Sequence, residues 1–189
     1  MTERCLVPVV DAAAVAKAIE AGVGREVRAT VGGSVDPRDN GPVVITGRGH
    51  ILSDGHCVFS DQKSRGTARR MGRPAVIEVG SISVLATERP AFTVDPAFFR
   101  SVGLEPREAR IVVVMSPFQF RDSYRGFARM LCVVDTPGPS TPRLERLECR
   151  HVSRPLYPVD ADLGPEIQTT IGAGRGHWRA GRASDGAIA

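Results

Sequence analysis

The beginning of the chain contains a strand, a helix and a strand in fixed order, and this feature constrains the fold most. An apolar run at Leu6–Val10 is followed by Asp11, whose carboxylate can accept hydrogen bonds from the first N–H groups of a helix. The next residues place Val15 and Ile19 one helical turn apart before glycines end the pattern. A second β-type run follows at Glu26–Val31. This order predicts an α/β fold with a βαβ-like start.

Two hairpins and a buried strand are predicted further along. The first hairpin joins Val43–Leu52 to His56–Phe59 across a tight turn, and the second joins Pro74–Val79 to Ile82–Thr87. The segment Arg110–Met115 is apolar without alternation, which is typical of a central strand buried on both faces. Together these runs predict a mixed sheet.

Flanking helices complete the predicted domain. Asp95 is expected to cap a short helix through Phe98–Val102, and the aromatic spacing predicts a longer helix over Phe120–Met130. A further strand is expected at Leu131–Val134. The polar and basic segment Asp61–Arg73 reads as an exposed loop.

Length and composition fit one domain with a tail. The chain has 189 residues, of which 42% are hydrophobic, and this is enough for one core. We expect the α/β domain to cover residues 1–160. Residues 161–189 are rich in Gly, Ala and Arg, and they are expected to form a disordered tail.

The same composition argues against several classes of protein. No apolar run approaches the roughly 20 residues of a membrane-spanning helix, so we expect a cytoplasmic protein without membrane contact. The net charge is +4, but the arginines are spread along the chain, which argues against nucleic-acid binding. The cysteines form no CxxC pair and are expected to be reduced; they are Cys5, Cys57, Cys132 and Cys149.

No catalytic motif is complete. His50 and His56 could approach each other across the first hairpin, but no further ligand accompanies them, and surface positions are the plainer interpretation. Cys149 and His151 could share one side of a strand, yet a third group is lacking. The loop Gly32–Gly41 either cradles an anion through its N–H groups or only reverses the chain.

Three arginines spaced four residues apart could contact a ligand. Arg121, Arg125 and Arg129 recur every four residues, as on a solvated helix face. Arg121 differs because it lies in the first turn after a predicted strand, where open α/β sheets tend to place their ligands.

The order of the segments resembles the C-terminal domain of the microcystinase C (MlrC-type) metallopeptidase family. The resemblance runs from about Val9 to Asp160. The segments that carry it are VVDAAAVAKAIEAGVG, VGGSVDPRDNGPVVITGRGHILSDGHCVF, AVIEVGSISVLATERPAFTVDPAFFRSVGLEPREARIVVVMS, FRDSYRGFARMLCVVDTPG and RPLYPVD.

The resemblance implies a zinc hydrolase that acts on amide bonds of linear peptides. In the family the metal ligands lie in an N-terminal domain, so the resemblance implies no zinc or other cofactor in this chain, which would be a truncated or split form. It departs from the family at Met115 and Gln119, where relatives have a lysine and a histidine, and at Ser34, where they have a lysine. These changes remove polar groups from an expected cleft.

Two functions follow as expectations. In the first, the chain is the accessory, substrate-cleft domain of a metallopeptidase-type hydrolase and is not catalytic alone. Its expected substrate contacts are Gly33, Asp36, Ser116, Gln119 and Arg121. In the alternative, it is a non-enzymatic remnant that acts as an interaction or dimerisation module. A nucleic-acid binder acting through the Arg-rich tail is a weaker third reading.

The expected partners follow from the same resemblance. They are a separately encoded N-terminal domain and a second copy of this chain. Self-association is expected because a missing strand–helix unit would leave a sheet edge or an apolar face uncovered.

Overall fold

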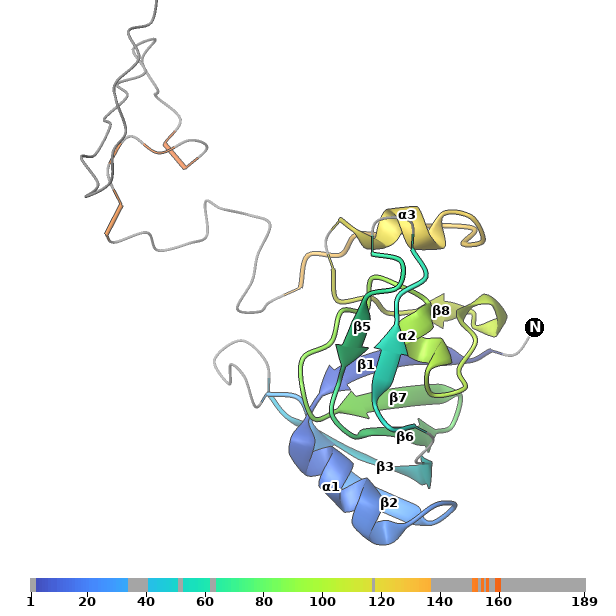
Figure 1. Ribbon diagram of the computed structural model, residues 1–189. Helices are drawn as coiled ribbons and strands as arrows, with labels where there is room; N and C mark the ends of the chain where they lie inside the picture. Colours follow the sequence, from blue (N-terminus) through green and yellow to red (C-terminus); the bar gives the residue numbers. More distant parts are fainter. Residues whose placement is uncertain are drawn as a thin grey trace, which may run out of the picture. The chain divides into compact units, whose positions relative to one another are not determined.

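A computed structural model shows a mixed α/β fold, as predicted (Figure 1). The structure describes residues 3–33, 41–50, 53–61, 64–116 and 118–136, together with 151, 152, 154, 156, 159 and 160. Residues 1–142 form one compact unit, which contains every helix and strand named below. In the second unit, residues 143–189, Arg154 forms an ion pair of 2.6 Å with Asp160. The predicted tail, 161–189, lies outside the described residues.

A six-stranded mixed sheet is the centre of the first unit, with the strand order β2-β3-β6-β7-β1-β8. Its strands are β1 (Cys5–Val10), β2 (Glu26–Val31), β3 (Val43–His50), β6 (Pro74–Val79), β7 (Ile82–Thr87) and β8 (Ile111–Val112). β1 pairs in parallel with β7 and β8, whereas β2, β3, β6 and β7 pair antiparallel in sequence. The predicted hairpin of β6 and β7 is confirmed.

The predicted strand–helix–strand start is confirmed in its elements. The carboxylate of Asp11 accepts a hydrogen bond of 2.9 Å from the N–H of Ala14 and caps α1 (Ala12–Ala21). Gly22 ends the helix at a φ of 88°, a left-handed conformation that suits glycine. However, β1 and β2 do not pair with each other, because β3, β6 and β7 lie between them. The parallel pairs come from β1 with β7 and β8 instead.

Each face of the sheet has its own core. On one face, buried small residues let α1 approach closely; this cluster is Ala14, Val15, Ala18, Val27, Ala29, Ala75, Ile77 and Ala86. The other face is covered by α2 (Ala97–Arg100) and by a separate hairpin. That cluster includes Leu6, Leu85, Cys57, Met71, Phe98 and Phe99.

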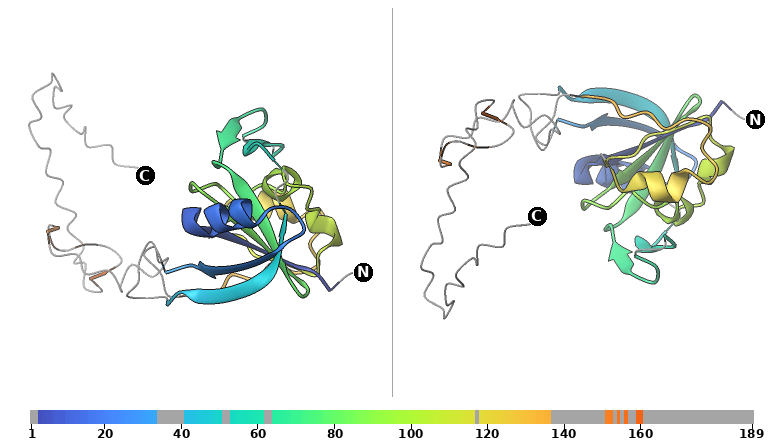
Figure 2. Two further views of the ribbon diagram at one scale, coloured as in Figure 1. Left: turned by 90° about the horizontal axis from the view of Figure 1, so that it is seen from below. Right: turned by 90° about the horizontal axis from the view of Figure 1, so that it is seen from above.

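The first predicted hairpin is wrong in its pairing. His56–Val58 forms β4, but its partner is β5 (Ala68–Arg70), not β3, and the two form a separate two-stranded sheet. β5 therefore lies inside the segment that was predicted as a loop. Both views in Figure 2 show this hairpin, in teal and green, projecting from the rest of the unit. Its inner side chains, such as Cys57, reach the core, and this long-range burial is what the local pattern could not show.

The prediction of a central strand at Arg110–Met115 is also wrong. Only Ile111–Val112 forms a strand, and it is the edge strand of the sheet. Ile111 is 56% exposed and Met115 is 51% exposed. A continuous apolar run is compatible with burial on both faces, but no described strand pairs with β8 on its outer side.

The last predicted helix is shorter than expected, and the strand after it is not formed. α3 covers Phe120–Tyr124, followed by turns, and buries Phe120 and Tyr124. Residues 129–136 carry no strand, so the prediction at Leu131–Val134 is wrong. Val133 and Val134 are exposed, so the apolar run lacks the packing that would stabilise a strand. Among the described residues, no helix is long and apolar enough to cross a membrane.

Candidate functional site

A buried carboxylate organises the loops beneath α3. Asp95 is fully buried, and its two oxygens accept hydrogen bonds from the backbone N–H groups of Ser60, Asp61 and Ala97 at 2.7, 2.6 and 2.7 Å. The Ser60 hydroxyl donates a fourth bond of 2.9 Å. One side chain therefore joins the end of the β4 segment to the start of α2.

The electrostatics of Asp95 follow from these contacts. Burial is the largest influence and raises the pKa of its carboxyl, but the hydrogen bonds from Ala97, Asp61 and Ser60 together outweigh burial and lower the pKa. Asp95 is thus held as a carboxylate whose lone pairs are already used. It serves as an anchor for the surrounding loops and is not suited to act as a proton donor.

Two arginines face the space beside this anchor. The guanidinium of Arg100 forms two hydrogen bonds with Glu105, of 2.8 and 3.0 Å, and these bonds lower the pKa of the Glu105 carboxyl. The guanidinium of Arg107 lies over the ring of Phe127, 4.8 Å from its centroid. The pair with Glu105 offsets the charge of Arg100, whereas the guanidinium of Arg107 packs on the aromatic ring.

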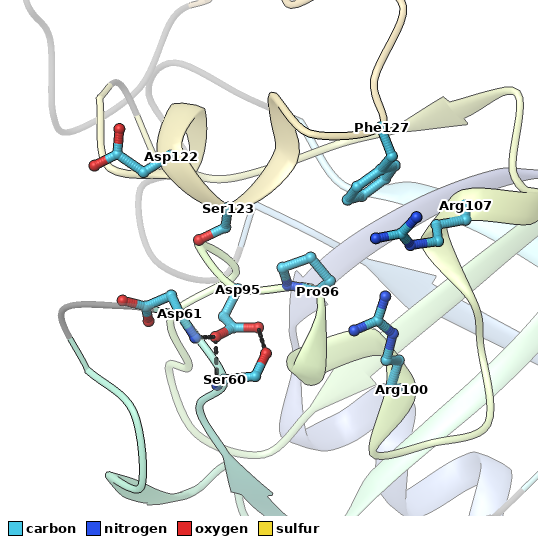
Figure 3. A pocket seen from close by; sticks show the side chains of 9 residues that line it. All are labelled: Ser60, Asp61, Asp95, Pro96, Arg100, Arg107, Asp122, Ser123 and Phe127. Atoms are coloured by element: carbon cyan, nitrogen blue, oxygen red, sulfur yellow. Dashed lines mark hydrogen bonds between the residues drawn. The ribbon is translucent and has the colours of Figure 1, made fainter.

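A polar pocket of about 260 Å³ lies between these groups. In Figure 3, Asp61, Asp122 and Ser123 lie on one side of it, and Arg100, Arg107 and Phe127 lie on the other. Its lining consists of Ser60, Asp61, Asp95, Pro96, Arg100, Arg107, Asp122, Ser123 and Phe127. Hydroxyls, carboxylates and guanidinium groups can hydrogen-bond polar atoms of a peptide, but these residues include no Cys or His to serve as a nucleophile and base.

Three of the predicted substrate contacts lie next to this pocket in sequence, at the start of α3. Gln119 is the N-cap residue of α3, makes no capping hydrogen bond through its side chain and is exposed. Arg121 is exposed, with its guanidinium 6.0 Å from the centroid of the Phe118 ring. Ser116 is half-buried, and its neighbour Met115 donates its N–H to the Thr93 hydroxyl at 2.7 Å. Gln119 and Arg121 are therefore accessible to a ligand.

The other two predicted contacts come from the glycine-rich loop. Gly33 follows β2 with a φ of 69°, and Asp36 lies outside the described residues. Within the described part of the chain, no hydrogen bond or ion pair links Gly33 to Ser116, Gln119 or Arg121.

The arginine stripe does not form on one regular helix. α3 ends at Tyr124, so Arg121 lies within it, Arg125 is its C-cap residue and Arg129 lies beyond it. All three side chains are exposed.

The histidines are not brought together as a metal site. His50 lies on β3, where its Nε2 is 3.4 Å from a carboxylate oxygen of Glu78, whereas His56 pairs with Asp54 at 2.8 Å. Among residues 3–33, 41–50, 53–61, 64–116 and 118–136, and the six described beyond them, no three His, Cys, Asp or Glu side chains gather to hold a metal ion. The donor set of the described residues therefore does not fit zinc.

The described cysteines carry free thiols. They are Cys5, Cys57 and Cys132. Burial, followed by the charge of Asp95, raises the pKa of the Cys57 thiol to about 11, so it stays protonated and inert near neutral pH.

Sequence reasoning missed most of the pocket. Asp95 was found as a helix cap, but Ser60, which binds it, precedes it by 35 residues. Arg100 and Arg107 flank an acidic residue at 105, and this spacing is a local signal that could have suggested an ion-pair cluster. No local signal places them beneath Phe127.

Comparison with known proteins defines the class of this domain. A family model described as "MlrC C-terminus" matches residues 1–151. The chain therefore belongs to the MlrC C-terminal domain family, as the order of its segments suggested.

Two relatives give the same assignment. Microcystinase C from Sphingomonas sp. is 27% identical over 160 residues, which are 85% of this chain and 30% of that protein. The crystal structure of a "putative metallopeptidase" from Mesorhizobium sp. BNC1 has a TM-score of 0.74 and 27% identity, and the match covers 86% of this chain and 32% of that one. The chain thus spans about a third of the length of these relatives.

Proposed function

We propose that this chain is the accessory, substrate-cleft domain of a metallopeptidase-type hydrolase that acts on amide bonds of peptides. The proposal rests chiefly on membership of the MlrC C-terminal domain family, whose matched relatives include a microcystinase. In this proposal the metal chemistry belongs to the other part of the enzyme. The chain itself supplies groups that bind and orient the peptide.

The accessible end of α3 supports a role in binding. Gln119 and Arg121 present an amide and a guanidinium to solvent, and both groups suit peptide carbonyl or carboxylate oxygens. Ser116 precedes them, and Gly33 and Asp36 would contribute from the glycine-rich loop. Each of these contacts is part of the proposal.

A chimera tests this role. The chain would replace the matched 30% of Microcystinase C, and hydrolysis of a linear peptide would be measured. We expect Arg121→Ala to raise KM about tenfold with a smaller change in kcat, because a charge-assisted hydrogen bond to the substrate is lost. Arg121→Lys should recover part of the loss.

Arg125→Ala is the matched control, since Arg125 is also exposed but follows α3. An unchanged KM in Arg121→Ala, or an equal rise in Arg125→Ala, would disprove the role of Arg121.

The alternative function is that of a non-enzymatic interaction module. Met115 and Gln119 favour it, because the resemblance leads one to expect a lysine and a histidine there. It predicts that the chimera binds peptide no better than a protein without this domain and does not hydrolyse it. Restoring Lys and His through Met115→Lys and Gln119→His should then recover activity if these two losses are the cause.

A further inference from the structure

Toward β1 and β8, the α1 face of the sheet carries apolar side chains that the described residues cover only in part. The strand register places Ile82, Cys5 and Ile111 side by side across β7, β1 and β8. In the next row Val84 lies beside Val7, and the N–H of Val113 bonds to the oxygen of Leu6 on the same strand as Val7. Side chains alternate along a strand, so these rows share one face.

The burial pattern identifies which face this is. Val112, which is paired with Leu6, packs against the cluster beneath α2. Ile111 and Val113 therefore point to the opposite face, which carries α1. Val9, two residues beyond Val7, packs against the α1 cluster and confirms this direction.

Within these two rows Val84 is buried, but the side chains at the ends of the rows are exposed. Ile82 is 41% exposed, Ile111 is 56% exposed and Val113 is 39% exposed. Cys5 and Val7 between them are half-buried. We call the residues Cys5, Val7, Ile82, Ile111 and Val113 the open face. Aliphatic side chains gathered in adjacent rows are typical of a surface that binds another polypeptide.

The outer edge of β8 adds backbone groups to this surface. β8 pairs with β1 on one side and with no other described strand. Arg110, Ile111 and Val113 use their N–H groups toward β1, so the N–H of Val112 turns toward the open edge. An edge of this kind can accept a further strand or be covered by a helix.

The longer relatives indicate what covers the open face. The matched part is 30% of Microcystinase C and 32% of the Mesorhizobium protein, so most of each relative lies outside it. The family model describes a C-terminus, so that remaining polypeptide precedes the domain. β1 begins at Cys5, within the open face, so in the longer relatives a segment that precedes the domain would join it beside this face.

We propose that the open face and the β8 edge are the docking surface for the polypeptide that precedes this domain in its longer relatives. Docking would bury the exposed Ile82, Ile111 and Val113 side chains. This inference rests on the proposed accessory function, because an accessory domain has to be held against the part that it serves. It adds the surface on which that contact is made.

The thiol of Cys5 provides a direct probe of this surface. Cys5 lies between Ile82 and Ile111, and burial raises the pKa of its thiol, so alkylation is measured at mildly alkaline pH. Iodoacetamide labelling of Cys5 would be compared between the isolated chain and the Microcystinase C chimera by peptide mass spectrometry. We expect at least about tenfold slower labelling in the chimera, because linkage makes docking intramolecular.

Matched variants show whether Cys5 is protected from alkylation by docking on the open face or by another effect of the chimera. Ile111→Lys with Val113→Lys should restore fast labelling of Cys5 in the chimera, since two charges would enter an apolar contact. Val58→Lys is the control, because Val58 is 58% exposed but lies on β4, outside the six-stranded sheet. It should leave Cys5 protected.

Two results would overturn the proposal. One is equal labelling of Cys5 in the chimera and in the isolated chain. The other is protection that rises with the concentration of the isolated chain, with a dimeric mass that Ile111→Lys abolishes, since this would assign the open face to a second copy. Peptide hydrolysis is read separately. Protected Cys5 without an effect of Arg121→Ala contradicts only the cleft function, whereas hydrolysis with unprotected Cys5 contradicts only the docking surface.

Discussion

The two halves of the α1 face use the same kinds of residue but differ in what lies over them. Over β2, β3, β6 and β7, α1 packs with small buried side chains, and Ile77 is fully buried. Toward β1 and β8, Ile111 is 56% exposed on the same face. Figure 1 shows α1 beside β2 and β3, with β8 at the other end of the sheet.

This difference shows that one helix of ten residues is too short to close a six-stranded sheet. A ten-residue helix is about 15 Å long, and strands are spaced at about 4.8 Å, so it cannot cover every strand of this sheet. The apolar side chains of β8 therefore stay exposed unless another polypeptide packs on this end of the sheet. Substitutions at Ile77 and Ile111 should therefore differ in how much they lower the free energy of unfolding.

The largest effect is expected from a substitution in the half of the face that α1 covers. Ile77→Ala should lower the free energy of unfolding by about 3 kcal/mol, because the removed methyl groups leave a cavity under α1. Urea unfolding followed by circular dichroism measures it. Ile77→Val is the conservative control and should cost about 1 kcal/mol. A loss below that value for Ile77→Ala would mean that α1 does not pack tightly on this half.

A smaller effect is expected on the opposite face of the sheet, where the buried carboxylate of Asp95 joins the loops to α2. Asp95→Asn should lower the free energy of unfolding by about 2 kcal/mol, since an amide nitrogen cannot accept the hydrogen bonds that Ser60, Asp61 and Ala97 donate. Asp54→Asn is the matched control. Its carboxylate is exposed and pairs with His56, and such pairs contribute little. An equal loss in both variants would contradict the anchoring role of Asp95.

The lowered pKa of Asp95 also predicts how its contribution to stability changes with pH. The pKa of Asp95 is lower in the folded protein, so its stabilising contribution is complete above the unfolded pKa near ~4 and is lost as pH falls through the folded pKa. The difference in stability between the wild type and Asp95→Asn should therefore shrink below pH ~4. A difference that persists unchanged in acid would show that it arises from packing and not from charge.

Local signals in the sequence predicted the elements that depend on local contacts. Asp11 and Gly22 bound α1 because a cap and a left-handed glycine act within one helical turn. The turn between β6 and β7 likewise joins neighbours in sequence. The same reasoning gave the mixed sheet and placed Asp95 near the start of a helix; the N-cap residue of α2 is Pro96, and the Asp95 carboxylate accepts a hydrogen bond from the N–H of Ala97.

Elements whose burial depends on distant segments were misjudged. Arg110–Met115 has the composition of a central strand, yet its position at the edge depends on what lies beyond β8. β4 was predicted to pair with β3 because they are close in sequence, whereas it pairs with β5 and its Cys57 side chain is buried in the core. In the pocket, the bond between Ser60 and Asp95 crosses 35 residues, and no periodicity encodes it.

The smallest expected effect concerns the open half of the α1 face. Ile111→Ala in the isolated chain should change the free energy of unfolding by about 0.5 kcal/mol or less, because most of the side chain is already in water. The measurement is the same urea unfolding as for Ile77→Ala, so the effects at the covered and the exposed isoleucine can be compared directly. In the Microcystinase C chimera the same substitution should cost more, since Ile111 would be buried there. A loss of stability in the isolated chain as large as that of Ile77→Ala would contradict this prediction, because it would mean that a second copy of the chain already covers Ile111. The contrast between the two halves would then hold only for the monomer.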